Sequence, residues 1–189
     1  MNELLRLNMI IGLTGTMASG KGEVAKYLIS KGFEHLMYSD ILKEVANERG
    51  IELTRKNLQK LGNDIKQEEK NLGILSKKII EKAKTDKVVA DGVRNPDEIR
   101  EFKKRKDAYV IAVTASQRVR FKRMKMRGRE GDPTGFREFK RLDNIENRGV
   151  TKGQEINNCI KIADYVIENI GTLDELKKKV DEILEKVNV

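Results

Sequence analysis

A glycine-rich segment near the start of the chain has the residues and spacing of a phosphate-binding loop. The segment Gly15-Thr16-Met17-Ala18-Ser19-Gly20-Lys21-Gly22 matches the pattern GxxxxGK. Glycines let successive backbone N–H groups turn toward phosphate oxygens, the following helix offers its positive N-terminus, and the lysine adds a mobile charge. So short a pattern also occurs in turns without chemistry, but here it lies between an apolar run and a helical pattern. The segment therefore predicts nucleotide binding.

The loop lacks one residue that most loops of this kind carry. The position after the lysine, where serine or threonine usually binds Mg²⁺, is Gly22. We therefore expect Mg²⁺ to be held by phosphate oxygens, water and a carboxylate from elsewhere in the chain. ATP and GTP both remain open as the donor. The residues expected to contact ATP here are Gly15, Met17, Ala18, Ser19, Gly20, Lys21, Gly22 and Glu23.

A second candidate element follows the predicted strand Val88 to Ala90. Asp91 comes directly after this strand, and Arg94 follows in the same turn. Because parallel sheets bind ligands beyond the carboxyl ends of their strands, both side chains would emerge beside the phosphate loop. Asp91 would orient Mg²⁺ through water, and Arg94 would grip a second phosphorylated molecule with its planar fork. The alternative interpretation is a turn aspartate and a surface arginine.

Further charged residues lie where the same sheet edge and a covering lid are predicted. Asp40 follows the second predicted strand, where substrate contact and helix capping are both open. Arg123 and Arg127 share a helix face because they are four residues apart, and they precede the polar segment 127–153, which contains several glycines. We expect this segment to be a mobile lid, held by little apolar burial, that closes over phosphates. A solvated helix face is the alternative for the basic residues.

Strands and helices alternate along the whole chain. The expected strands are Met9 to Leu13, Phe33 to Tyr38, Val88 to Ala90, Tyr109 to Val113 and Tyr165 to Ile167. The expected helices begin after the phosphate loop and near Ser39, Thr54, Leu72, Asn95, Ser116, Pro133, Lys152 and Thr172. This order predicts an α/β fold with a doubly wound five-stranded parallel sheet and a helical lid. We expect one domain over residues 1–189, with 39–84 as an acceptor-binding helical region and 127–153 as the lid insert.

Composition narrows the function classes. The 189 residues carry a formal net charge of +9, which favours polyanionic partners such as phosphorylated metabolites or nucleic acids. One cysteine, Cys159, and one histidine, His35, exclude an internal disulfide and leave little for a zinc site, and we expect both residues to be packed rather than catalytic. No apolar stretch approaches the roughly 20 residues that span a bilayer, and residues 1–8 lack signal-peptide features. We expect a cytoplasmic protein without a membrane partner.

From Ile11 to about Leu184, the chain resembles the P-loop kinases of small phosphorylated metabolites, which include nucleoside monophosphate kinases and dephospho-coenzyme A kinase. The resemblance is closest to the archaeal proteins described as dephospho-coenzyme A kinase-like or adenylate kinase-related. It is carried by Gly20-Lys21-Gly22-Glu23, by Asp91-Gly92-Val93-Arg94, by the lid entry Arg127 to Pro133, and by the segment Ala163 to Thr172 with its Asn169-Ile170-Gly171 turn.

The resemblance implies a role for each matching residue. Arg94 would bind the acceptor phosphate, Arg127 would contact the transferred phosphates, and Arg123, Asn169 and Gly171 would lie at the adenine. Taken together with the residue patterns, we expect Lys21, Asp91, Arg94 and Arg127 to be catalytic, with Asp91 holding Mg²⁺ through water, and Asp40, Arg94 and Arg129 to bind the acceptor. Tyr38-Ser39-Asp40 replaces the acidic and histidine-containing element of dephospho-coenzyme A kinases. A nucleoside or deoxynucleoside monophosphate is therefore the preferred acceptor, and dephospho-coenzyme A is the alternative.

Two interpretations of other classes use the same residues. A nucleic-acid-binding regulator would use the positive charge directly, although only Phe121 interleaves with the basic run, so that stacking on bases has little support. A nucleotide-binding switch would bind ATP and change the order of the lid without using an acceptor. The kinase interpretation needs no nucleic acid and leaves the oligomeric state open.

Overall fold

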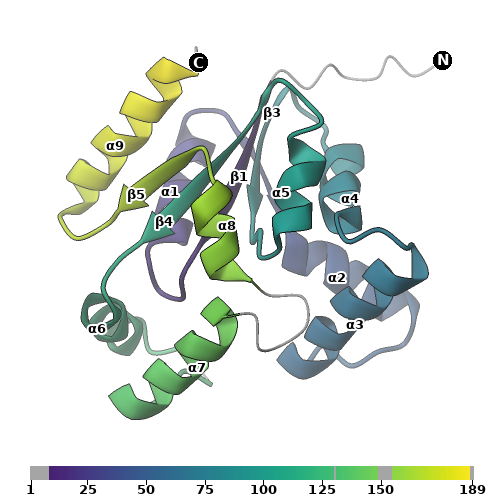
Figure 1. The fold of residues 1–189 in the computed structure, drawn as a ribbon, viewed down its shortest axis with the longest axis horizontal. Helices are drawn as coiled ribbons and strands as arrows, with labels where there is room; N and C mark the ends of the chain where they lie inside the picture. Colours follow the sequence, from purple (N-terminus) through teal and green to yellow (C-terminus); the bar gives the residue numbers. More distant parts are fainter. Residues whose placement is uncertain (1–8, 130, 149–154, 188–189) are drawn as a thin grey trace.

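The computed structural model describes residues 9–129, 131–148 and 155–187 (Figure 1). Five parallel strands form one sheet in the order β2-β3-β1-β4-β5. Their bounds are β1 Met9–Gly15, β2 Glu34–Met37, β3 Lys87–Asp91, β4 Ala108–Thr114 and β5 Tyr165–Glu168. The predicted doubly wound parallel sheet is therefore confirmed, and all five strands lie within a residue or two of their expected bounds.

Helices cover both faces of the sheet. Figure 1 shows α5 (Pro96–Phe102) and α8 (Ile156–Ile162) in front of it and α1 (Lys21–Ser30) behind it. Alternate residues of β1 face the two layers: Ile11 packs with α1 and with α9 (Leu173–Lys186), whereas Ile10 packs with the helices of the other face. Since β1 is apolar toward both layers, it can only be a central strand.

The helices between β2 and β3 gather at one end of the sheet. They are α2 (Tyr38–Glu48), α3 (Arg55–Glu68) and α4 (Ile74–Lys82). Helices α3 and α4 begin close to the expected starts at Thr54 and Leu72, and Lys70 takes a left-handed φ of 49° between them. Helix α2 begins at Tyr38, so Asp40 lies in its first turn and does not cap it.

Side-chain caps mark several of the predicted helix starts. Thr54, Asn95, Ser116 and Thr172 each accept a backbone N–H at the start of their helices. Helix α7 (Phe136–Arg148) begins later than the expected Pro133, and the Asp132 carboxylate expected to cap it pairs with Arg127 instead. The expected helix start at Lys152 lies outside the described residues.

The lid segment differs from the expectation of little apolar burial. Helix α6 (Gln117–Arg127) leads into it, and α7 lies beside α6 at one side of the sheet edge (Figure 1). Phe139 on α7 has no exposed surface, and its ring contacts those of Phe121 and Phe136. Part of the segment is therefore held by a small apolar cluster. No helix in the described part of the chain is both long enough and apolar enough to cross a membrane.

Candidate active site

The phosphate loop joins the end of β1 to the start of α1, as predicted. The Lys21 ammonium folds back over it, donating to the carbonyl oxygens of Gly15 at 2.7 Å and Thr16 at 3.0 Å. Ala18 takes a left-handed φ of 57°, a conformation that costs a residue with a side chain some free energy. The loop is thus a strained backbone turn with a lysine lying across it.

Lys21 is half-buried, and desolvation of its ammonium is the main reason why its pKa falls from 10.5 to about 8. The charges of Asp91 and Glu146 oppose this decrease, whereas those of Arg94 and Arg120 add to it. Three residues that the sequence placed at one sheet edge, Lys21, Asp91 and Arg94, are therefore close enough to act on one another. A bound phosphate would add a negative charge beside this partly desolvated ammonium.

Two buried hydroxyl groups of the loop indicate whether it could bind a polyphosphate. The Oγ atoms of Thr16 and Ser19 are buried and have no hydrogen-bond partner among the described residues. Buried hydroxyl groups are normally paired, so an unpaired one needs a partner that is not part of the chain. Phosphate oxygens accept such hydrogen bonds, and they would also accept from Lys21. The donor set of the loop therefore fits the phosphates of a nucleotide.

The turn after β5 closes one side of the loop. The Asn169 amide donates to the Ser19 carbonyl oxygen at 2.8 Å, and Arg123 donates to the Asn169 carbonyl oxygen at 2.9 Å. Gly20 has a φ of 106°, and a Cβ at this position would collide with the Asn169 amide. The structure thus joins Arg123 and Asn169 to the loop, although they are far apart in the sequence.

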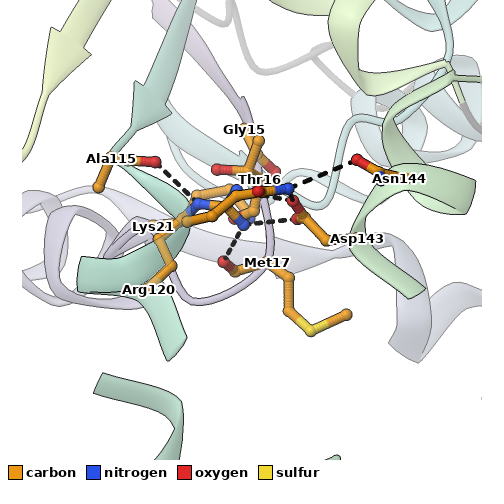
Figure 2. Close-up of polar contacts among 9 residues, drawn as sticks. Gly15, Thr16, Met17, Lys21, Ala115, Arg120, Asp143 and Asn144 are labelled. Carbon is orange, nitrogen blue, oxygen red and sulfur yellow. Dashed lines mark hydrogen bonds and ion pairs between the residues drawn. The ribbon is translucent and has the colours of Figure 1, made fainter. Parts of the chain in front are cut away.

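Arg120 is the cation that sequence reasoning left without a role. Figure 2 shows it between the loop and α7, donating to the Met17 carbonyl oxygen at 3.0 Å. It also makes a two-pronged contact with Asp143, at 2.5 and 2.7 Å. Gln117 donates to the same carboxylate at 2.9 Å. Both charged groups are buried, so Arg120 connects α7 to the phosphate loop and has little freedom to turn elsewhere.

Helical spacing carried a signal for this contact. Phe136, Phe139 and Asp143 recur at positions that share one face of α7. A carboxylate on an otherwise apolar face must find a cation when it is buried. The sequence therefore marks Asp143 as a partner in an ion pair, but it does not single out Arg120 from the other basic residues of α6.

The turn after β3 presents Asp91 and Arg94. Asp91 lies opposite Leu13 of β1, directly before the phosphate loop begins, and its Oδ2 is 3.5 Å from Nε2 of His35 on β2. The Arg94 side chain is exposed and makes no hydrogen bond or ion pair with the residues that the structure describes. Its guanidinium is therefore available to an anion at this edge.

Among the described residues, the side chains of Arg127, Arg129, Asp40 and Glu23 make no hydrogen bond to the loop. Arg127 pairs with Asp132, which holds the pKa of that carboxyl below its usual range, and Arg129 is exposed. Asp40 pairs with Lys43 at 2.8 Å. Glu23 and Gly171 are exposed, on α1 and after β5. Arg127, Arg129 and Asp40 would reach a ligand only after exchanging partners or moving.

The remaining candidates for metal or thiol chemistry are limited. Among the described residues, no group of three or more His, Cys, Asp or Glu could hold a metal ion. Cys159 is buried in the core, as expected, and burial raises the pKa of its thiol to about 12, so it stays protonated at neutral pH.

Comparison with known proteins gives related chains of nearly equal length. A family profile described as an AAA domain matches residues 11–147. The UPF0200 protein of Hyperthermus butylicus is 34% identical over 181 residues, which cover 95% of each chain. That of Sulfurisphaera tokodaii is 36% identical over 184 residues, covering 97% of this chain and 99% of the relative.

Solved structures of kinases share the fold at low identity. Shikimate kinase from Aquifex aeolicus has a TM-score of 0.56 at 18% identity and covers 94% of this chain and 97% of its own. The Mycobacterium tuberculosis APS kinase, solved with AMPPNP and APS, has a TM-score of 0.55 at 18% identity, with coverages of 95% and 99%. A Sinorhizobium meliloti gluconokinase scores 0.51 at 15% identity, covering 97% of each chain.

Proposed function

The chain belongs to the UPF0200 family, and from that premise we propose that it is an ATP-dependent phosphotransferase acting on a small phosphorylated acceptor. The observation that carries the proposal is the grouping of Lys21, Asp91 and Arg94 at one end of the parallel sheet, with unpaired buried hydroxyl groups in the loop. A donor site and an exposed arginine beside it are what transfer between two phosphorylated molecules requires.

Each residue has a part in positioning charge. The loop N–H groups and the hydroxyl groups of Thr16 and Ser19 bind donor phosphates, and Lys21 leaves the loop carbonyl oxygens to follow the transferred group. Arg123 and Asn169 border the base of the nucleotide. Arg94 holds the acceptor phosphate, with Asp40 and Arg129 beside it, and Arg127 joins from the lid. No general base is needed, because alignment of the two reacting groups and neutralisation of the phosphate charges supply most of this catalysis.

Magnesium is the cofactor that we assign to this site. Bound Mg²⁺ supplies charge neutralisation at the donor phosphates. Gly22 offers no hydroxyl to it, so Asp91 is the carboxylate that we assign to its water shell.

The preferred acceptor is a nucleoside or deoxynucleoside monophosphate. Arg94 provides a planar fork for one phosphate, and α2, α3 and α4 form the region next to it that would hold the rest of the acceptor. Dephospho-coenzyme A also carries phosphates and is the alternative acceptor. Nucleic acid is not required for this activity.

The test is a panel assay of the whole protein. ADP release from ATP and Mg²⁺ is measured with each nucleoside monophosphate, each deoxynucleoside monophosphate and dephospho-coenzyme A, and products are identified by chromatography. We expect one acceptor class to stimulate ADP release and to be recovered with an added phosphate. Slow hydrolysis that no acceptor stimulates would indicate a nucleotide switch. Binding to DNA or RNA that weakens steeply with salt concentration, without phosphorylation of any acceptor, would indicate a nucleic-acid-binding regulator.

A further inference from the structure

The turn that carries Arg94 is held through its backbone on every side. The contacts run from the N–H groups of Gly92 and Val93 to the Leu13 carbonyl oxygen at 3.3 and 3.1 Å, from Thr14 Oγ1 to the Val93 carbonyl oxygen at 2.8 Å, and from the Glu155 N–H to the Arg94 carbonyl oxygen at 2.7 Å. The guanidinium of Arg94, by contrast, is exposed. The backbone of Arg94 is therefore held in place, whereas its guanidinium remains exposed.

One buried carboxylate completes this arrangement. Oε2 of Glu98 accepts from the N–H groups of Arg94 at 2.8 Å and Asn95 at 3.2 Å. Its other oxygen, Oε1, lies 2.7 Å from Nζ of Lys66 on α3. Glu98 is 2% exposed and Lys66 is 6% exposed. The backbone of the arginine turn is thus tied through one carboxylate to a helix of the acceptor region.

A second link joins the same parts. The Tyr38 hydroxyl and the Ser76 hydroxyl lie 2.5 Å apart, and Ser76 donates to the Glu98 carbonyl oxygen at 2.8 Å. Tyr38 opens α2 and Ser76 lies in α4, so all three helices between β2 and β3 reach Glu98. Burial raises the pKa of the Tyr38 hydroxyl well above its usual range, so it remains a neutral hydrogen-bonding group.

A matched element elsewhere in the chain shows that helix capping does not require this network. Thr172 and Glu175 form the same capping box at the start of α9 as Asn95 and Glu98 form at the start of α5. Glu175 accepts from the Thr172 N–H at 2.7 Å, but this contact is exposed and includes no lysine. The buried lysine at Glu98 is therefore an addition to the cap.

The stability of the fold alone does not account for the buried ion pair of Lys66 and Glu98 either. Removing two charges from water is costly, and apolar residues of similar size often serve a buried position as well as an ion pair does. We propose that Lys66 and Glu98 are positioning residues that hold Arg94 in place relative to α3. This inference rests on the proposed function, since Arg94 is taken to hold the acceptor phosphate. A misplacement of about 1 Å can slow a reaction strongly, so the link would act on acceptor use.

The experiment compares Lys66→Met with Lys60→Met, an exposed lysine on the same helix. With the acceptor found by the panel assay, we expect Lys66→Met to raise the KM for the acceptor about tenfold or more while the KM for ATP changes less than about twofold. Lys60→Met is expected to leave both values unchanged. An unchanged acceptor KM, or an equal rise in both values, would overturn the proposal.

A second measurement keeps the two proposals separable. Hydrogen exchange of the Arg94 and Asn95 amides, followed by NMR, is expected to be at least about tenfold faster in Lys66→Met than in Lys60→Met. If no acceptor is found, the proposed function fails, and this exchange rate still decides whether Lys66 holds the turn. Should Lys66→Met not fold, the double variant Lys66→Met/Glu98→Gln takes its place, because it removes both charges and keeps a carbonyl oxygen that can accept from the Arg94 and Asn95 amides. Exchange as slow as in the unaltered protein would overturn the positioning role.

Discussion

The cations of the donor loop and the cation of the acceptor turn are held in opposite ways. Lys21 already donates to two loop carbonyl oxygens, and Arg120 is shared between Met17 and Asp143. Arg94 has a fixed backbone, but its charged group has no partner among the described residues. Phosphate binding in the loop would therefore exchange hydrogen bonds, whereas the acceptor phosphate of the proposed reaction would meet a guanidinium that has no partner to give up.

This difference separates two sources of binding free energy. At the acceptor turn, the ordering cost is met when the protein folds, which is the general benefit of preorganisation. At the donor loop, a desolvated ammonium regains a full negative partner when phosphate binds, so binding there is coupled to protonation. A change at Lys21 should therefore act on donor binding, and a change at Arg94 should act on acceptor binding.

The largest effect is expected from Lys21→Ala. Because the ammonium follows charge onto the transferred group, turnover should decrease by about 10² or more while the fold persists. Lys26→Ala, which removes an exposed lysine from the same helix, is the control. Steady-state kinetics and circular dichroism provide the measurement. A folded Lys21→Ala variant with the original turnover would remove the mechanism proposed here.

The next effect is expected from Arg94→Ala. Loss of a charge-assisted, two-pronged contact should reduce acceptor use by about tenfold to a hundredfold with ATP binding nearly unchanged. Arg94→Lys should restore little, since a lysine lacks the planar fork. Arg100→Ala, an exposed arginine on α5 paired with Asp97, serves as the control. Equal losses for ATP and acceptor would place Arg94 on the donor side.

A pH series distinguishes the two sides with a smaller effect. Desolvation lowers the pKa of Lys21 to about 8, and phosphate binding would raise it. Below that pH the ammonium is already charged, so affinity for a nonhydrolysable ATP analogue should be constant. Above it, Lys21 must take up a proton on binding, and affinity should weaken by up to about tenfold per pH unit. Calorimetry in buffers of different ionisation enthalpy measures the proton uptake, which Lys21→Ala should abolish.

The smallest effect is expected at the lid. Phe139 and Asp143 are buried, whereas Gly128, Arg129, Gly131, Thr134 and Gly135 are exposed, so these parts should differ in amide hydrogen exchange. We expect exchange in the exposed part to slow severalfold with ATP analogue and Mg²⁺, and further with acceptor present. Exchange near Phe139 should be slow throughout. If both parts exchange at the same slow rate with and without ligand, the segment is a static insert.

Much of this protein was predictable from local sequence. Strands and capped helices follow from short patterns, and the phosphate loop from its glycines and lysine, because each depends on neighbours along the chain. Asp91 and Arg94 were placed correctly beside the loop, since the ends of parallel strands share one edge. The expectation that the lid would bury little apolar surface was wrong. The cluster formed by Phe121, Phe136 and Phe139 depends on α6 and α7 meeting, which short sequence patterns do not show.

The sequence by itself determined the order in which strands and helices follow one another along the chain. It also determined the chemistry of the phosphate loop after the first strand. Only the tertiary structure decided which charges pair: Arg120 with Asp143, and Lys66 with Glu98. The sequence offers many lysines and arginines, and nothing local distinguishes the buried ones from those in water. Burial selects among them, because a carboxylate removed from solvent must be paired, and helix packing decides which cation lies within reach.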